Sequence, residues 1–548
     1  MNTAAAGGGG LTAGPQWGEA AGGGDEPGPT WFDSGAGASV PAVAGIDPSS
    51  LDAVLAGGPG GNDRLAALVA VVLTSISHGT SARRGPLPSG GPHAVADAVR
   101  EALGDEVLPV VGIGAVTALA ELTRTLAYGA ADPADPDCAA HLHCPPLAVA
   151  AAADLAVSIL NPSLDSWDQA PAATTVETEV VAALAGLVGY APKLAGGVLT
   201  TGGTESNLMG LLLAREAVVR RQYGTEAVVT GLPAAARGRL RILASQLAHF
   251  SVARTAALLG LGERSVIGVP VDDQRRMDPA ALAAALERVE SAGEVPIAVV
   301  ATAGTTDYGS IDPTPAIAQI ALEHGAWLHV DAAYGGGALF SSRLAPLLDG
   351  IAAAESVSLD LHKLGWQPVA AGVLLTRRAA ALAPLELNVG YLNPQDDEEA
   401  GYPSLLGRSL RTTRRADAFK VAVTLRALGR TGLGRMVDRC HDLARHAARR
   451  IDAHPRLALD AAPVLTTVVF RYLSAADDPD RVNAALRRRL LAEGRAVVGR
   501  ADTGPAVGGP DAGRVRLKLT FLNPATTPAD VDRLLGMVVA AGEKEDGC

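Results

Sequence analysis

The sequence predicts an α/β fold built around a mainly parallel sheet, and three observations support that prediction. Short apolar or β-branched runs alternate with amphipathic helical segments between about residues 166 and 430, which is the pattern of successive βαβ units. Before residue 165 the apolar spacing is helical. After residue 431 strand-like and helical segments mix, which is typical of a smaller α+β domain.

These changes in pattern divide the chain into four segments. They are a Gly/Ala-rich tail predicted to be disordered, an N-terminal helical segment, a large domain and a small C-terminal domain, at residues 1–45, 46–165, 166–430 and 431–548. In the second segment a Pro/Gly-rich break separates the predicted helices. The helices are expected at 51–57, 63–76 and 93–103, and the break at 83–92.

The large domain contains short apolar runs bounded by turn residues, which predict strands. These candidates lie at 240–244, 296–301, 326–330, 356–359 and 372–375, and a further short strand is expected between Gly197 and the glycine turn at Gly202. A helix is expected at 175–189, because Thr174 and Glu177 have the spacing of a capping box and apolar residues follow on one face. The small domain is expected to have a long helix and two strands, near 436–454, 465–472 and 515–521.

Composition excludes several classes of protein. The net charge of −12 comes from 46 basic and 58 acidic residues without a basic stripe, so nucleic acid is not an expected partner. No apolar run is expected to span a membrane, since Gly, Pro and charged residues interrupt the Ala-rich stretches. Four scattered cysteines do not form a disulfide framework, and the start of the chain lacks a secretory signal. A cytoplasmic location is expected.

A histidine–lysine pair follows the strand candidate at 356–359. The segment is Ser356-Val-Ser-Leu-Asp-Leu-His362-Lys363-Leu-Gly-Trp366. A lysine that forms an imine must exist in part as the neutral amine, which requires a pKa lowered by burial or by neighbouring cations. Most such pairs are exposed on the surface, so the pair alone does not indicate catalysis.

An aspartate follows the strand candidate at 326–330, in Trp327-Leu-His-Val-Asp331-Ala-Ala-Tyr334. Ligands of open α/β sheets bind beyond the carboxyl ends of the strands. A buried aspartate at that edge needs a cationic partner, and a protonated pyridine nitrogen meets that need. Ala333 is small enough for a flat ring to lie against it. A capping or turn aspartate is the alternative.

Three further polar turns follow strand candidates. Gly203 and Thr204 begin a helix, where backbone N–H groups and a hydroxyl suit a phosphate. His249 has a flat ring that can stack on a planar cofactor and take part in proton transfer. Thr306 offers a hydroxyl in another turn. A helix cap, a solvated histidine and a polar turn are the alternatives, but one crevice at the sheet edge would collect all these groups.

The order of these motifs resembles the group II pyridoxal-phosphate-dependent decarboxylases. This fold type I, aspartate-aminotransferase-like family includes aromatic-amino-acid, glutamate, diaminobutyrate and siderophore-type lysine decarboxylases. HVDAAYGG and DLHKLGWQP are similar to its aspartate and Schiff-base lysine motifs, and GGTESNLMGLLLAR is similar to its phosphate loop. YLNPQDDEEAGYPSLLGRSLRTTRRADAFK is similar to its mobile loop and the segment after it. The resemblance runs from about residue 50 to the end.

The resemblance implies that the cofactor is pyridoxal 5′-phosphate and that three residues hold its ring. Lys363 would form the Schiff base and Asp331 would pair with the pyridine nitrogen. His249 would stack on the ring, and Ala333 is expected to contact the ring because of its small size. Lys363 and His249 are also expected to be catalytic.

The resemblance places other residues at the phosphate and at the substrate carbon. Gly203 and Thr204 would hold the phosphate with His362 nearby, and Thr306 would line the cofactor. Tyr391 matches a mobile-loop tyrosine that protonates the substrate carbon after carbon dioxide leaves. A packing role is the alternative for this tyrosine.

The expected reaction converts an L-amino acid into its amine and carbon dioxide. The loop segments resemble decarboxylases of basic diamino acids such as 2,4-diaminobutyrate and lysine, and a small aliphatic amino acid is the other candidate. His143-Cys144-Pro145-Pro146 stands where aromatic-amino-acid decarboxylases carry bulkier residues, which argues against a catecholamine-type substrate. An aminotransferase, a sulfur lyase, an oxidative decarboxylase or an inactive cofactor-binding scaffold are the alternatives.

The resemblance also implies a homodimer whose N-terminal helices pack across the interface. No metal is expected. The cluster of His141, His143 and Cys144 has no second group of ligands elsewhere in the sequence. The expected partner is therefore a small-molecule amino acid, without nucleic acid or membrane.

Overall fold

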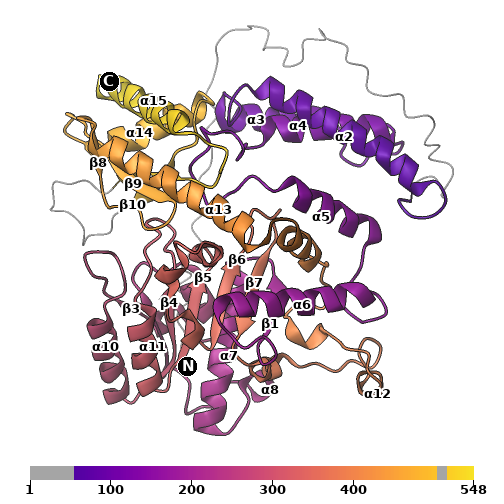
Figure 1. The fold of residues 1–548 in the computed structure, drawn as a ribbon, viewed down its shortest axis with the longest axis vertical. Coiled ribbons are helices and arrows are strands. Elements are labelled where there is room, and N and C mark those ends of the chain that lie inside the picture. Colours follow the sequence, from indigo (N-terminus) through magenta and orange to yellow (C-terminus); the bar gives the residue numbers. More distant parts are fainter. Residues whose placement is uncertain (1–54, 503–514, 548) are drawn as a thin grey trace, which may run out of the picture. The chain divides into compact units, whose positions relative to one another are not determined.

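Figure 1 shows the computed structural model, in which residues 55–502 and 515–547 are described. The tail expected at 1–45 lies outside these residues. The helix expected at 51–57 lies mostly outside them too, and its described residues 55–57 are not helical. The other expected N-terminal helices are confirmed. This part of the chain forms α2 (Gly61–Arg83), α3 (Gly91–Leu103), α4 (Ala115–Gly129) and α5 (Ala148–Leu160).

A seven-stranded sheet forms the centre of the large domain, in the order β1-β7-β6-β5-β4-β2-β3. Neighbouring strands from β6 through β3 are parallel, and only β7 runs antiparallel to its neighbours. All the strand candidates of this region are confirmed. The strands are β1 (Gly196–Thr200), β2 (Leu240–Ser245), β3 (Val266–Val269), β4 (Val295–Thr302), β5 (Trp327–Ala332), β6 (Ser356–Asp360) and β7 (Gly372–Thr376).

Helices bury both faces of this sheet, which explains why its strands are nearly continuous apolar runs. On β4, Val299 and Ala301 pack in one core cluster with α10 (Pro279–Ser291) and α11 (Thr314–Glu323). The alternate residues Ala298 and Val300 pack in another with α7 (Gly203–Tyr223). Shorter helices complete the domain: α8 (Ala227–Thr230), α9 (Ser251–Leu258), η1 (Glu263–Ser265), η2 (Gly335–Phe340), η3 (Ala345–Leu348), η4 (Ile351–Ala353), η5 (Ala379–Leu385), α12 (Gln395–Glu399) and η6 (Leu406–Arg408).

Helix α6 (Pro171–Val188) begins four residues earlier than expected, and its capping box is not formed. Pro171 takes the first helical position, which suits its fixed backbone angle. Thr174 lies inside the helix and its hydroxyl donates to the Ala170 carbonyl oxygen at 2.9 Å. Glu177 is buried and forms a 2.6 Å ion pair with Arg414. The capping-box prediction was wrong, because Glu177 pairs with a distant arginine that the local sequence pattern does not show.

The C-terminal part forms a four-stranded antiparallel sheet in the order β10-β11-β9-β8. Its elements are α13 (Ala418–Asp452), β8 (Leu457–Leu459), β9 (Thr467–Tyr472), α14 (Pro479–Ala492), β10 (Gly499–Asp502), β11 (Val515–Thr520) and α15 (Pro528–Asp546). The expected long helix and both expected strands are confirmed. Helix α13 crosses position 430 with a kink at Gly429, where φ is 60°. The domain boundaries stay a prediction.

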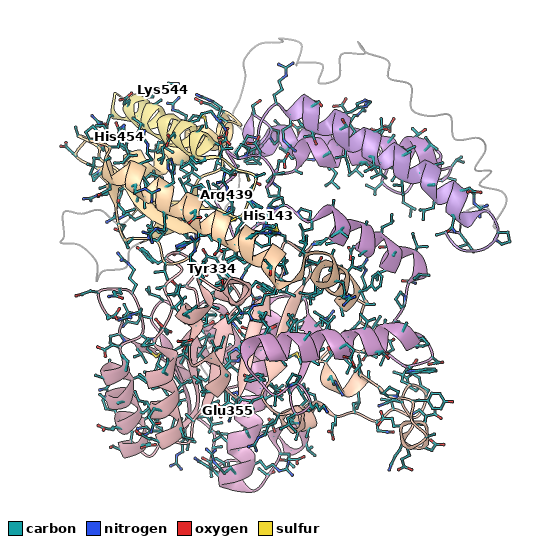
Figure 2. All side chains as sticks on the ribbon, viewed as in Figure 1. His143, Tyr334, Glu355, Arg439, His454 and Lys544 are labelled. Carbon is teal, nitrogen blue, oxygen red and sulfur yellow. The ribbon has the colours of Figure 1, made fainter. Side chains whose placement is uncertain are left out.

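Tyr334 connects the two sheets. Its hydroxyl lies 2.8 Å from the Thr466 hydroxyl and 2.9 Å from the Thr467 hydroxyl, and it accepts from the Thr466 N–H at 3.0 Å. Figure 2 shows Tyr334 between the large sheet and α13. The turn after β5 is thereby held from the small-domain side.

Helices α2 and α6 are long and apolar enough, by length and composition, to cross a membrane. The expectation was that no segment is apolar enough to span a membrane. The two helices differ from it because an Ala-rich helix stays apolar on average even when short polar residues interrupt it. Core helices of soluble proteins meet the same criteria, and α6 packs against β1, β7 and α13. Helix α2 packs along α4, but Leu73 and Ile76 on it remain exposed.

Candidate active site

A cavity of about 340 Å³ lies at the carboxyl ends of the parallel strands. The turns after β1, β2, β4, β5 and β6 all contribute to its wall, as expected for an open α/β sheet. The expected site residues that line it are Gly203, Thr204, His249, Thr306, Asp331, Ala333, His362 and Lys363. Tyr391 is not among its lining residues.

Lys363 is the lysine that reaches this cavity. The other four lysines of the chain lie elsewhere: Lys420 and Lys518 are buried in ion pairs with aspartates, and Lys193 and Lys544 are exposed. Lys544, labelled in Figure 2, lies on α15 at the far side of the small domain. A reaction that needs a primary amine in the cavity therefore depends on Lys363.

The ion-pair partner of Lys363 is an acid, so a neighbouring cation, one of the two expected ways to lower its pKa, is not its ion-pair partner here. Its Nζ atom lies 2.9 Å from Oδ2 of Asp360, the last residue of β6. The same carboxylate lies 3.5 Å from Nε2 of His362, a ring whose pKa is lowered, chiefly by burial. The Ala371 N–H donates to Nδ1 of His362 at 3.3 Å, so the hydrogen of the neutral ring is on Nε2.

Asp331 is buried, with 5% of its surface exposed, and it accepts three hydrogen bonds. Oδ2 accepts from Nδ2 of Asn207 at 2.8 Å. Oδ1 accepts from the Ala333 N–H at 3.1 Å and from the Ser358 hydroxyl at 3.2 Å. Within the described residues no basic side chain forms an ion pair with Asp331. A buried carboxylate of this kind is matched by a cationic ligand.

His249 also lines the cavity, and its ring is in the neutral form. Burial lowers the pKa of its imidazole, and the nearby Asp331 carboxylate only partly opposes that effect. Nδ1 lies 2.8 Å from the Ser251 hydroxyl and also accepts from the Ser251 N–H at 3.3 Å. An acceptor at Nδ1 leaves the ring hydrogen on Nε2.

Comparison with known proteins agrees with this geometry. Residues 115–473 match the family model described as the pyridoxal-dependent decarboxylase conserved domain. The chain belongs to the pyridoxal-dependent decarboxylase family. It is therefore a pyridoxal-phosphate-dependent amino-acid decarboxylase, and the expected family, fold type, reaction and cofactor are confirmed.

Individual relatives of this decarboxylase cover most of its length. L-2,4-diaminobutyrate decarboxylase of Rhizobium meliloti (strain 1021) is 43% identical over 433 residues, which is 79% of this chain and 83% of that protein. The enzyme of the same name from Acinetobacter baumannii is 37% identical over 75% and 80% of the two chains. The crystal structure of the glutamate decarboxylase domain of diaminobutyrate-pyruvate transaminase and L-2,4-diaminobutyrate decarboxylase from Vibrio parahaemolyticus has a TM-score of 0.79 at 33% identity, covering 89% and 98%.

The residues of this decarboxylase fit pyridoxal phosphate at its phosphate end. A Cβ atom at position 203 would lie 2.9 Å from the Cβ of Ala333 and 3.2 Å from Oδ2 of Asp360, so only glycine leaves the backbone N–H groups accessible there. Helix α7 begins at this residue, and the first N–H groups of a helix attract anions. Two cavity residues also have a buried oxygen without a partner, Oγ1 of Thr302 and Oδ1 of Asp360.

A buried carboxylate shapes the turn that carries Thr306. Asp312 accepts from the Thr302 N–H at 2.8 Å and from the Met277 N–H at 2.7 Å. Burial raises its pKa to about 6. The turn between these anchors brings Thr306 to the cavity of the decarboxylase, where the sequence analysis expects it.

Tyr391 lies outside the cavity. It is 83% exposed and lies before α12, beside Trp167 and Tyr402. The structure of one chain therefore does not bring this side chain to Lys363, and its catalytic role stays a prediction. A mobile loop must move, or a second chain must contribute it, for the role to hold.

Four residues that contact the expected site residues had no role predicted from the sequence: Asn207, Asp360, Ser251 and Ser358. Asn207 and Asp360 do stand in the quoted motifs, one four residues after Gly203 and the other three before Lys363. Asp360 could have been predicted, because it is a polar residue at the end of a strand. Asn207 stands in the quoted motif, but nothing in the sequence indicates that it bonds to Asp331.

Within the described residues, no group of three or more His, Cys, Asp or Glu side chains is arranged to hold a metal. The Cys144 thiol is instead engaged with the backbone, since Sγ lies 3.2 Å from the His362 carbonyl oxygen. Burial raises the pKa of this thiol to about 12. Cys144 therefore packs beneath the lysine turn as a neutral residue.

Proposed function

We propose that this decarboxylase acts on 2,4-diaminobutyrate, releasing carbon dioxide and leaving 1,3-diaminopropane. The similarity to two enzymes named L-2,4-diaminobutyrate decarboxylase, at 43% and 37% identity over three quarters or more of this chain, carries the proposal. The net charge of −12 also favours a cationic substrate over an acidic one. Relatives named for acidic amino acids and cysteine sulfinic acid are only 30% and 31% identical.

The test is a decarboxylation screen with the cofactor-loaded enzyme. Carboxyl-labelled 2,4-diaminobutyrate, ornithine, lysine, glutamate, valine and tryptophan are offered, and labelled carbon dioxide and the amine mass are measured. We expect kcat/KM for 2,4-diaminobutyrate to exceed that for ornithine, one methylene longer, by roughly tenfold or more. A preference for glutamate or valine would contradict the proposed substrate but not the decarboxylation reaction. Amine transfer without labelled carbon dioxide would overturn the reaction.

Each cavity residue has a proposed task in this reaction. Bound pyridoxal phosphate supplies an electron sink for the bond that breaks when the carboxyl group leaves. The Lys363 amine holds the cofactor aldehyde, and the Asp360 carboxylate at 2.9 Å keeps that lysine beside the site whenever it is released. Asp331 holds a proton on the ring nitrogen. Neutral His249 covers the ring face and offers Nε2–H as a donor.

Residues at the phosphate end and in the turns are proposed to orient the cofactor and the substrate. The α7 amino terminus and the Thr204 hydroxyl bind the phosphate, while His362 offers Nε2–H nearby. Thr306 and Ala333 confine the ring. Because these groups are held by buried strands and by Asp312, the scissile bond can be kept in one orientation relative to the ring.

Tyr391 is proposed to donate the proton that replaces the carboxyl group. Changing Tyr391 to phenylalanine should leave the cofactor dissociation constant within about twofold and reduce amine formation by roughly 10²- to 10³-fold, the usual contribution of a positioned acid. Carbon dioxide and amine are measured separately. Tyr402→Phe, a change on the same loop, is the matched control. Unchanged amine output in Tyr391→Phe would remove this residue from the mechanism.

The N-terminal helices support the proposed homodimer. Leu73 on α2 is 62% exposed and Leu126 on α4 is 73% exposed, and the connection between α3 and α4 exposes several more apolar residues. Apolar patches of this kind mark interaction surfaces. We propose that a second copy of the chain covers them.

Changing Leu126 to glutamate should weaken the dimer, because a charge would enter an apolar contact. Sedimentation velocity should show a dissociation constant raised by about tenfold or more. Leu322→Glu is the matched control, since Leu322 on α11 is also 73% exposed but lies outside the N-terminal helices. A dimer of equal strength in both variants would place the interface elsewhere.

We propose a cytoplasmic location. The three cysteines in the described part of the chain, Cys138, Cys144 and Cys440, carry free thiols, and a reducing compartment keeps thiols in that state. Fractionation of cells that make the protein, with thiol trapping, tests the proposal. Recovery with the secreted or membrane fraction would contradict it.

A further inference from the structure

A chain of hydrogen bonds leads from Asp331 through the cavity residue Asn207 to His329, Ser356 and Trp327, which do not line the cavity. Nε1 of Trp327 donates to the Ser356 hydroxyl at 2.8 Å, and that hydroxyl lies 2.8 Å from Nδ1 of His329. Nε2 of His329 lies 3.0 Å from Oδ1 of Asn207, and Nδ2 of Asn207 donates to Asp331 at 2.8 Å. The chain thus joins β5, β6 and α7.

The two ends of this chain determine its direction. The Trp327 indole can only donate, and an ionised Asp331 can only accept. Asn207 must therefore turn its NH₂ group toward Asp331, which leaves its carbonyl oxygen facing His329. Nε2 of His329 must then carry the hydrogen.

The middle of the chain has the same direction. His329 is fully buried, and burial lowers the pKa of its ring, so it carries one hydrogen. With that hydrogen on Nε2, Nδ1 accepts, and the Ser356 hydroxyl must donate to it while accepting from Trp327. Every donor points toward Asp331, and hydrogen bonds aligned in this way strengthen one another.

A branch of the chain reaches His249. The second hydrogen of the Asn207 amide is directed at the Ser251 hydroxyl at 2.9 Å. The hydroxyl then donates to Nδ1 of His249, which also accepts from the Ser251 N–H. One amide therefore orients both the Asp331 carboxylate and, through Ser251, the His249 ring.

The packing around His329 leaves its ring without exposure to solvent. A Cβ atom at Gly210 would lie 2.7 Å from Cε1 and Nδ1 of the His329 ring, so α7 can approach the strand only with glycine there. Asn207, His329 and Ser356 are each at most 1% exposed. If one of these side chains lost its hydrogen-bond partner, a water molecule could take that partner's place only after a cavity had formed.

We propose that Trp327, Ser356, His329 and Asn207 are positioning residues that keep Asp331 ionised and aimed at the cofactor ring nitrogen. Proton loss from that nitrogen to Asp331 would place a hydrogen on a carboxylate that already accepts from Asn207, Ser358 and the Ala333 N–H. The chain opposes that transfer. The inference rests on the proposed pairing of Asp331 with the ring nitrogen.

The test compares two replacements of His329 in the cofactor-loaded enzyme. His329→Leu removes both ring nitrogens, whereas His329→Gln keeps a donor toward Asn207 and an acceptor toward Ser356. The enzyme is loaded with cofactor labelled with ¹⁵N in its ring, and the ring-nitrogen chemical shift reports protonation. We expect the ring-nitrogen chemical shift of His329→Gln to equal that of the parent enzyme. In His329→Leu we expect it to move toward the value of an unprotonated nitrogen. We expect kcat to fall about tenfold in His329→Leu with KM within about twofold.

A second variant covers the case in which His329→Leu does not fold. Ser356→Ala removes one hydroxyl and should move the ring-nitrogen shift in the same direction by a smaller amount. Asp331→Asn serves as the reference. If Asp331→Asn changes the shift but His329→Leu and Ser356→Ala do not, the chain is not needed and the inference fails. If Asp331→Asn leaves the shift unchanged, the proposed role of Asp331 fails instead.

The buried state of His329 also makes stability depend on pH. Burial lowers its pKa in the folded chain, so below the ordinary value of about 6.5 the unfolded chain binds a proton that the folded chain excludes. The free energy of unfolding should therefore fall as the pH drops, by up to about 1.4 kcal/mol per pH unit from this group. Urea unfolding of the cofactor-loaded protein at several pH values measures it.

His329→Gln should reduce that pH dependence. Asp312, whose pKa is raised to about 6, acts in the opposite sense, since its ionisation on raising the pH costs stability. Both effects are present in the parent, and only the histidine effect is absent from the variant. An equal pH dependence in parent and variant would show that the buried histidine is not its source.

Discussion

Replacing Lys363 with alanine should abolish the visible absorption of the bound cofactor and lower decarboxylation by about 10⁴-fold or more, as expected for loss of a residue that forms a covalent link. No other lysine of the chain can take over this role, because none of the other four reaches the cavity. The cofactor can still bind through its phosphate and ring nitrogen. We therefore expect it to remain dialysable and to absorb as the free aldehyde.

Lys193→Ala is the matched control, since Lys193 is exposed and should retain the absorption band and full activity. Borohydride reduction followed by peptide mass analysis provides a second measurement, because it fixes the cofactor to the lysine that held it. Recovery of the cofactor on a peptide from any of the other four lysines would contradict the assignment. A retained band in Lys363→Ala would do the same.

Asp331→Asn should produce the second largest effect, a fall in kcat of about 10²-fold to several thousandfold. Removing one partner of a buried ion pair costs roughly 3–5 kcal/mol, and about 1.4 kcal/mol corresponds to a factor of ten. An asparagine also introduces an NH₂ group among three donors, from Asn207, Ser358 and the Ala333 N–H. The change is measured with cofactor at saturation, so that weaker binding is separated from slower chemistry.

Ser358→Ala is the matched control for that change. It removes one of the three hydrogen bonds to Asp331, the longest at 3.2 Å, and leaves the charge. We expect less than about a tenfold loss of kcat, since a single such bond contributes about 1 kcal/mol. Equal losses in Asp331→Asn and Ser358→Ala would mean that the carboxylate acts only through its placement and not through its charge.

Much of the cavity could be predicted because the chemistry follows strand ends. Residues at the carboxyl ends of parallel strands meet at one edge of the sheet, so Gly203, His249, Thr306, Asp331 and Lys363 could be assigned to one crevice without knowing the order of the strands. Local patterns were less reliable where a distant residue competes. Glu177 pairs with Arg414 in place of closing the expected capping box.

The sequence by itself determined the fold class, the family, the cofactor and the residues proposed to hold it, since these depend on residue types at fixed short spacings. Only the tertiary structure decided what surrounds those residues. His329 meets Asn207 across 122 positions of the chain and Asn207 meets Asp331 across 124, through contacts that depend on how α7 packs on β5 and β6. Only the tertiary structure likewise showed where Tyr391 lies, because its side chain is 83% exposed and does not line the cavity.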